Sequence, residues 1–287
     1  MGTAADDVST SELASLVSRN TSFALDLYRA LTEGNKENLF FSPYSISLAL
    51  AMTYAGARGK TAAQMAQALH FALPQKRLHP SFGALSWALA KEGEEVPSLE
   101  GRPFKLRVAS ALWGQEGHPF LPEFLELLVQ NYGAGFERVD FAVDPEKARL
   151  IINAWVEEKT EGKIRELLEP GDVHRLTRLV LTNAIYFNAA WHDPFDEKLT
   201  SPAPFHLLDG SQVLVPMMHR TELFSYAEGV DYQAVELPYR GRDGLPSSFS
   251  MVIVLPKSPA SSRRSKGRSP SKSYAPSLGN LRQKPWL

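Results

Sequence analysis

The sequence contains no cysteine, and this absence excludes several kinds of site at once. Without thiols the 287-residue chain can form no disulfide, no cysteine-ligated zinc site and no thiol nucleophile. The sequence also has no unbroken apolar run of about 18 residues, so we expect no membrane span. Its opening segment, MGTAADDVST, lacks the basic region and the apolar stretch of a secretory signal, which leaves the localisation undetermined.

Motifs that carry catalysis or bind metals are missing as well. There is no GxSxG nucleophile elbow and no HExxH metal pair. The segment from Gly56 to Thr61 ends in Gly-Lys-Thr, but a phosphate-binding loop needs glycine where this sequence has Tyr54. The histidines are scattered, and we expect them to lie in solvent: His70, His79, His118, His174, His192, His206 and His219. The sequence therefore predicts a protein that is not an enzyme and has no cofactor or metal site.

Acidic residues are absent from the last 31 residues of the chain. That stretch carries eight lysines and arginines, whereas positions 1–256 hold the other 23 together with all 32 acidic residues. The same stretch is rich in serine and proline and offers almost nothing to bury. The sequence therefore predicts a mildly acidic globular body, residues 1–256, followed by a basic tail, residues 257–287.

Apolar residues at helical spacing predict a series of helices in the first half of the chain. They are expected at 12–31, 43–52, 61–69, 122–132 and after Asp144-Pro145. Start signals support these helices: capping boxes open at Ser9 and Thr61, and a capping side chain precedes proline at Ser42 and Asp144.

Strands dominate the second half. They are expected at 38–41, 106–113, 179–191, 203–207, 212–218, 233–238 and 249–255. The segment at 179–191, LVLTNAIYFNAAW, is almost continuously apolar, which favours a strand covered on both faces. At about 3.3 Å per residue it would span roughly 40 Å, so we expect it in the middle of a large sheet. Together the helices and strands predict an α+β fold.

Two polar residues, Thr182 and Asn183, interrupt this apolar strand. A buried amide is costly unless its hydrogen bonds are satisfied, so Asn183 needs a partner. One interpretation is that Asn183 only ties the strand to a neighbouring helix. The other is that it latches a sheet that must later open.

Five separated blocks resemble the serpin family. They are NLFFSPYSISLALAMTYAGARGKT at 38–61, INAWVEEKTEGKIRELL at 152–168, LVLTNAIYFNAAWHDPF at 179–195, VPMM at 215–218 and AVELPY at 234–239. They follow one another in the family's order over roughly residues 13 to 256. The resemblance implies the serpin fold, in which helices pack on a large mixed main sheet and smaller sheets accompany it.

The resemblance also implies a function. Serpins typically inhibit serine proteases of chymotrypsin-like or subtilisin-like type. The target cleaves an exposed reactive loop, which then inserts as a new strand into the main sheet and distorts the protease. By this resemblance the partner is a serine protease, and the protein would be extracellular.

Site residues are carried over from the resemblance position by position. Ser42, Ser45 and Asn183 match the family's shutter, the group that holds the main sheet closed. Trp191 and Thr200 match the breach, where insertion begins. Many serpins have lysine and glycine before the tryptophan, where this chain has Asn188-Ala189-Ala190.

The basic tail does not resemble the family's continuation. We find no small-residue hinge, reactive loop or closing apolar strands between Lys257 and Leu287, so the serpin domain at 1–256 is expected to be incomplete. A lost reading frame after Pro256 is one interpretation of the tail, and we favour it. The alternative is a non-inhibitory serpin-fold protein whose basic tail binds a polyanion. Because the last strands of the family are missing, we expect exposed apolar faces at Val252, Val254, Val235 and Leu237, poor folding and no inhibition by the chain as written.

Overall fold

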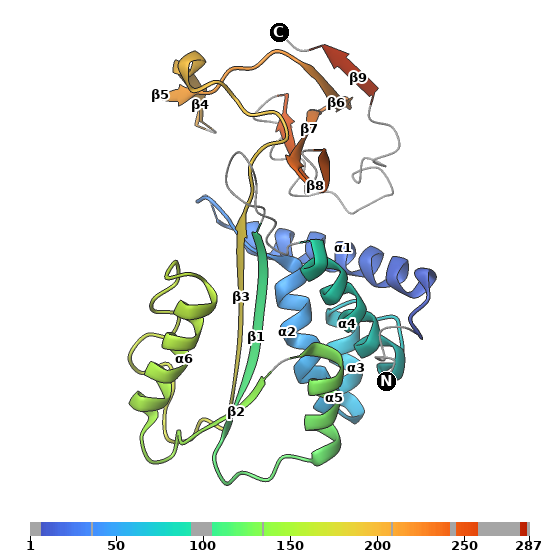
Figure 1. Cartoon of the computed structure of the whole chain (residues 1–287), viewed down its shortest axis with the longest axis vertical. Helices are drawn as coiled ribbons and strands as arrows, with labels where there is room; N and C mark the ends of the chain where they lie inside the picture. The colour runs from blue at the N-terminus through green and yellow to red at the C-terminus, as the bar shows by residue number, and fades with distance from the viewer. Residues whose placement is uncertain are drawn as a thin grey trace. The chain divides into compact units, whose positions relative to one another are not determined.

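The computed structural model of the chain describes residues 7–35, 37–92, 105–133, 135–207, 209–241, 245–257 and 282–285 (Figure 1). The described residues form two compact units, with the division between Phe187 and Asn188. The predicted domains 1–256 and 257–287 stay a prediction, since most of the tail lies outside the described residues.

The first unit combines six helices with a three-stranded sheet. The helices are α1 (Thr10–Thr32), α2 (Pro43–Gly56), α3 (Gly59–Ala68), α4 (Gln75–Glu92), α5 (Pro122–Tyr132) and α6 (Pro145–Lys159). The strands are β1 (Lys105–Gln115), β2 (Gly135–Val139) and β3 (Leu179–Asn188), in the order β2-β1-β3. With the sheets of the second unit, this arrangement confirms the predicted α+β fold. In the described part of the chain, no helix is both long and apolar enough to cross a membrane.

Most predicted helix starts are confirmed by their capping bonds. Ser9 and Glu12 form the capping box of α1, and the side chain of Asp144 accepts from the Lys147 N–H at the start of α6. The predicted capping box at Thr61 is wrong, because α3 begins two residues earlier, at Gly59. Gly59 has a φ of 55°, a backbone conformation that glycine adopts readily, and it turns the chain into the helix before Thr61.

Two strand predictions are also wrong. Residues 38–41 are irregular, and Phe40 is fully exposed, because no described strand pairs with this segment. The long apolar segment forms a strand of 10 residues that ends at Asn188, and it lies at the edge of its sheet rather than in the middle. Three strands were not predicted: β2 in the first unit, and β6 (Leu223–Glu228) and β9 (Arg282–Pro285) in the second.

Side chains alternate between the two faces of the sheet, as a pleated strand requires. Ala111 and Trp113 of β1 pack in one cluster with Ile152 of α6. Leu112 packs in another with Met52 of α2. The strands therefore lie between α6 on one face and α2 on the other, as the first unit appears in Figure 1.

His79 is buried, with 1% of its surface exposed, so the expectation that all histidines lie in solvent is wrong. It lies in α4 among aromatic rings, and its Nδ1 is 2.6 Å from the hydroxyl oxygen of Tyr132. Burial, with a smaller contribution from the charge of Arg58, lowers the pKa of His79 from 6.5 to about 4. Among the described residues, no histidines or acidic side chains group closely enough to hold a metal ion.

The buried histidine predicts a pH dependence of stability. In the unfolded chain His79 binds a proton below about pH 6.5, whereas in the folded chain it stays neutral down to about pH 4. The free energy of unfolding therefore falls as the pH falls through this window. From pH 7 to pH 5 we expect the free energy of unfolding to drop by about 2 kcal/mol through this residue. Urea unfolding at both pH values should show a drop that the His79→Phe variant lacks and the exposed-site variant His118→Phe keeps. An unchanged drop in His79→Phe would contradict this assignment.

The second unit is built from two antiparallel sheets. In the first, β4 (Ser201–His206) pairs with β5 (Gln212–Met217). In the second, β6 joins β7 (Tyr232–Arg240), β8 (Pro246–Pro256) and β9 (Arg282–Pro285), in the order β8-β7-β6-β9. The backbone of β9, at the end of the basic tail, pairs antiparallel with β6. Residues 258–281 of the tail, and the proposed polyanion contact with them, lie outside the described residues.

Strand β8 leaves both of its faces uncovered. Its five apolar residues Met251 to Leu255 are between 38% and 60% exposed. Successive strand residues point to opposite faces, so the described chain covers neither face. Val252 and Val254 are exposed as predicted, whereas Val235 is half-buried and Leu237 is buried, because β7 is flanked by β8 and β6.

Candidate functional site

The start of α2 presents buried serines toward the interior of the first unit. Ser42 is the N-cap residue, and its side chain accepts from the Ser45 N–H at 3.3 Å. Ser45 and Ser47 are 7% and 1% exposed, and neither hydroxyl oxygen has a hydrogen-bond partner among the described residues. A buried hydroxyl group without a hydrogen-bond partner costs free energy. The two serine hydroxyls at the start of α2 therefore destabilise this end of the helix.

Asn183 ties β3 to the neighbouring strand β1. Its Nδ2 donates to the hydroxyl oxygen of Ser110 at 2.7 Å. Both residues lie on the face of the sheet that carries Leu112 and Leu181, the face covered by α2. The interpretation that Asn183 ties the strand to a helix is therefore wrong. In the described structure no hydrogen bond joins Asn183 to Ser42 or Ser45, so Asn183 is not directly connected to the other two predicted shutter residues.

A second hydrogen bond joins the same two strands on the opposite face. The indole N–H of Trp113 donates to the hydroxyl of Thr182 at 2.9 Å, and Thr182 is 1% exposed. The rings of Trp113 and Trp155 meet edge to face at 5.7 Å between centroids. Our sequence analysis identified Thr182 but neither Trp113 nor Ser110 as partners. The only sequence signal was the presence of polar atoms in an apolar strand.

The pair Asn183 and Ser110 supports a quantitative prediction. The single variants Asn183→Ala and Ser110→Ala should each lower the free energy of unfolding by about 1 kcal/mol, since each removes one half-buried hydrogen bond. In the double variant the two losses should overlap, giving a coupling energy of about 1 kcal/mol in urea unfolding. Losses that simply add would show that the bond contributes nothing to stability.

The far edge of β3 has no partner strand among the described residues, since the sheet order ends at β3. An edge strand presents a row of unpaired N–H and C=O groups that another extended segment can pair with. The two cross-strand bonds hold β3 to β1 but leave this edge open. Within the described residues, the first unit therefore offers an edge with which another strand can pair.

Helix α6 is anchored over the sheet by polar contacts to one backbone position. Asn153, 4% exposed, donates to the Leu168 carbonyl at 3.0 Å and accepts from the Leu168 N–H at 2.9 Å. Arg149 adds a bond to the same carbonyl at 2.9 Å and pairs with Glu146. These contacts hold the segment that follows α6 against the helix. The position of α6 is therefore fixed by these hydrogen bonds as well as by the packing of its buried face on the sheet.

In the second unit, Trp191 stacks on Tyr239 with ring centroids 4.9 Å apart and an interplanar angle of 8°. The two residues form an isolated antiparallel bridge, and the flanking backbone bonds run from His192 N–H to Pro238 O and from Arg240 N–H to Ala190 O. The segment after β3 is thus paired to the end of β7. The stacking and the backbone bonds together fix the position of the Trp191 side chain.

Thr200 lies at the end of the short 3-10 helix η2 (Glu197–Leu199), where its N–H donates to the Glu197 carbonyl. No hydrogen bond between Thr200 and Trp191 is found among the described residues. Arg220 binds the segment next to Trp191 instead, through the carbonyl and carboxylate of Asp193, and its guanidinium lies 5.2 Å from the centre of the Phe224 ring. The sequence analysis missed Arg220.

Comparison with known proteins gives one consistent result. A family model described as Serpin (serine protease inhibitor) matches residues 18–268. The chain is 45% identical over 244 residues to the leukocyte elastase inhibitor of Bos taurus and 43% identical over 244 residues to that of Homo sapiens. Each alignment covers 84% of this chain and 61% of the relative, so the chain spans about three fifths of their length.

Solved structures agree with the sequence comparison. Emu ovalbumin (Dromaius novaehollandiae) matches with a TM-score of 0.84 and 28% identity, covering 94% of this chain and 71% of that one. An Arabidopsis serpin described as being in its native stressed conformation matches with a TM-score of 0.75 and 28% identity, covering 90% and 65%. Because the family model matches most of the chain and the fold agrees with these structures, this protein belongs to the serpin family.

Proposed function

We propose that a form of this protein that carries a reactive loop inhibits a serine protease of the elastase-like group. The cleaved loop would pair as a new strand beside β3. The open edge of β3 is the observation that carries the proposal. An inserted strand would satisfy the N–H and C=O groups of that edge and release free energy. The protein contributes no catalytic group; it acts by refolding.

Two observations support the predicted roles of the shutter and breach residues. Asn183 and Thr182 lie on β3 itself, and their bonds to β1 hold this strand in place. Trp191 follows β3 directly and is fixed by its stacking on Tyr239. We infer that Asn183 holds the edge strand in position until insertion. Ser42 and Ser45 support it through the helix that packs on the same face.

The 287-residue chain itself is proposed to be inactive. The tail at 257–287 has no small-residue hinge or apolar strand that could serve as the inserting loop. The test is incubation with an elastase-type serine protease, followed by denaturing electrophoresis. A covalent complex formed by the 287-residue chain would contradict its proposed inactivity. The inhibitory proposal would be overturned if residues 1–256, joined to the C-terminal part of the leukocyte elastase inhibitor of Bos taurus, also failed to form such a complex.

A further inference from the structure

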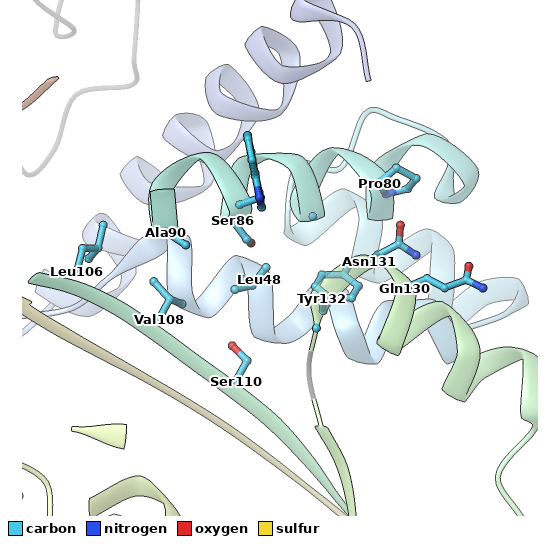
Figure 2. Close-up of a pocket in the computed structure, with 13 residues that line it drawn as sticks. Leu48, Pro80, Ser86, Ala90, Leu106, Val108, Ser110, Gln130, Asn131 and Tyr132 are labelled. Carbon is cyan, nitrogen blue, oxygen red and sulfur yellow. The ribbon is translucent and has the colours of Figure 1, made fainter. Parts of the chain in front are cut away.

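The two faces of the three-stranded sheet are covered unequally by the described helices. One face carries α2, α4 and α5, and a pocket lined by Leu48, Val108 and Ser110 lies between these helices and β1 (Figure 2). The other face carries α6, which forms the outer layer of the first unit on that side (Figure 1). The outward side of α6 is therefore a surface that no other described helix covers.

This outward side combines exposed apolar residues with one charge at each end. Leu150 and Ile151 are 53% and 42% exposed, and Ala154 is exposed as well. Lys147 lies one turn before them and Glu158 one turn after, both exposed. Because residues three and four apart share a face of a helix, Lys147, Ile151, Ala154 and Glu158 form one continuous row, which we call the outer row of α6.

The orientation of the outer row is fixed by the opposite side of the helix. Ile152 and Val156 are fully buried, and the ring of Trp155 meets that of Trp113 edge to face. The side chain of Asn153 binds both backbone groups of Leu168. The helix cannot roll without breaking these contacts, so the outer row is ordered before any partner arrives, which lowers the cost of binding.

The outer row is complementary to a second copy of itself that runs in the opposite direction. Its spacings of four, three and four residues are symmetric about the midpoint. An antiparallel copy therefore places Lys147 opposite Glu158 of the second copy, and Ile151 opposite Ala154. A two-fold axis repeats each of these contacts, and the small alanine leaves room for the larger isoleucine when two helices pack at about 8–10 Å.

The two charges of the row are available for such a contact. Within the described ranges Lys147 has no ion-pair partner, and Glu158 pairs with the adjacent Lys159 at 2.8 Å. The Glu158 side chain is 71% exposed and that of Lys159 42%, so this pair contributes little to stability. Both members of the expected intermolecular pair can therefore meet without breaking a buried interaction.

We propose that the outer row of α6 is a contact surface between two copies of this chain. The copies form an antiparallel helix pair, with a Lys147–Glu158 ion pair at each end and Ile151, Leu150 and Ala154 between them. One helix from each copy provides less area than a standard interface, so we expect a dissociation constant of roughly 10–100 µM. The contact uses neither the edge of β3 nor strand β8, and it is independent of the proposed inhibitory function.

The test is sedimentation velocity of the full 287-residue chain over about 1–300 µM, a range that brackets the expected dissociation constant. Every sample carries Val254→Lys, because a lysine on the exposed strand β8 disfavours pairing there. Lys147→Glu or Glu158→Lys alone places like charges at both ends and should raise the dissociation constant by at least about tenfold. The matched control is Lys60→Glu, an exposed lysine of α3, which should stay within about twofold.

Recombining the charges distinguishes this contact from general association. An equimolar mixture of Lys147→Glu and Glu158→Lys should form a heterodimer, because opposite charges meet again at both ends. The double variant should recover self-association for the same reason, whereas pairing at β8 has no such dependence. The proposal would be overturned by a chain that stays monomeric throughout, by a mixture that associates no better than its components, or by an equal loss in Lys60→Glu.

Discussion

An elastase-type serine protease mixed with the 287-residue chain is expected to stay fully active and to form no complex that survives SDS. Inhibition by strand addition requires a loop that is cleaved and then pairs with the open edge of β3. The chain has the edge, but we find no segment after Pro256 with the composition of such a loop. The protease should instead treat the chain as an ordinary substrate, because exposed segments are open to cleavage.

A completed chain provides the matched control. Residues 1–256 joined to the remaining C-terminal part of the leukocyte elastase inhibitor of Bos taurus, which is 45% identical over the aligned region, should form the SDS-stable complex. Replacing Asn183 by alanine in this chimera should accelerate spontaneous inactivation, because it weakens the bond that holds β3 to Ser110. A complex formed by the 287-residue chain alone would contradict the proposed inactivity.

Aggregation of the 287-residue chain is the second large effect that we expect. Among the described residues, strand β8 is at the end of its sheet and exposes Met251 to Leu255, so it combines an edge without a partner strand with five consecutive apolar side chains. Such a strand pairs readily with a second copy. The Val254→Lys variant should slow the loss of monomer by about tenfold, because a lysine on the edge strand disfavours this pairing.

The matched control for this experiment is Val230→Lys. Val230 is 94% exposed and lies between β6 and β7, so the substitution removes an exposed valine and adds the same charge outside an edge strand. Size-exclusion chromatography after a fixed incubation measures the remaining monomer. Equal protection by both variants would indicate that net charge, rather than the β8 edge, controls aggregation.

Helix starts were predicted well because they depend on a few neighbouring residues. The bonds of Ser9, Ser42 and Asp144 to nearby backbone N–H groups are local, and all three are present. The predicted start at Thr61 was wrong because the helix begins at the turn formed by Gly59. Sequence alone does not show which of two adjacent start signals, the glycine turn or the capping box, the helix will use. The strand expected at 38–41 was wrong because a strand needs a partner, and pairing is not a local property.

The candidate site was predicted only in part, for a similar reason. The apolar segment around Asn183 indicated that this amide needed a partner, but nothing in the sequence identified Ser110, which is 73 positions earlier. The burial of His79 was also missed. A single histidine in a weak helical pattern has no local signal for burial, which depends on the rings of Tyr54 and Tyr132 packing around it.

The sequence by itself determined the absence of thiol chemistry, the family resemblance, the positions of most helices and the change of composition after Pro256. These features depend on residue type and on short-range spacing. Only the tertiary structure decided that β3 lies at the edge of its sheet among the described residues, that Asn183 binds β1 rather than a helix, and that a pocket lies beside Ser110, between β1 and helices α2, α4 and α5. These features arise from contacts between residues far apart in the chain, where packing and hydrogen-bond geometry in three dimensions determine which groups meet.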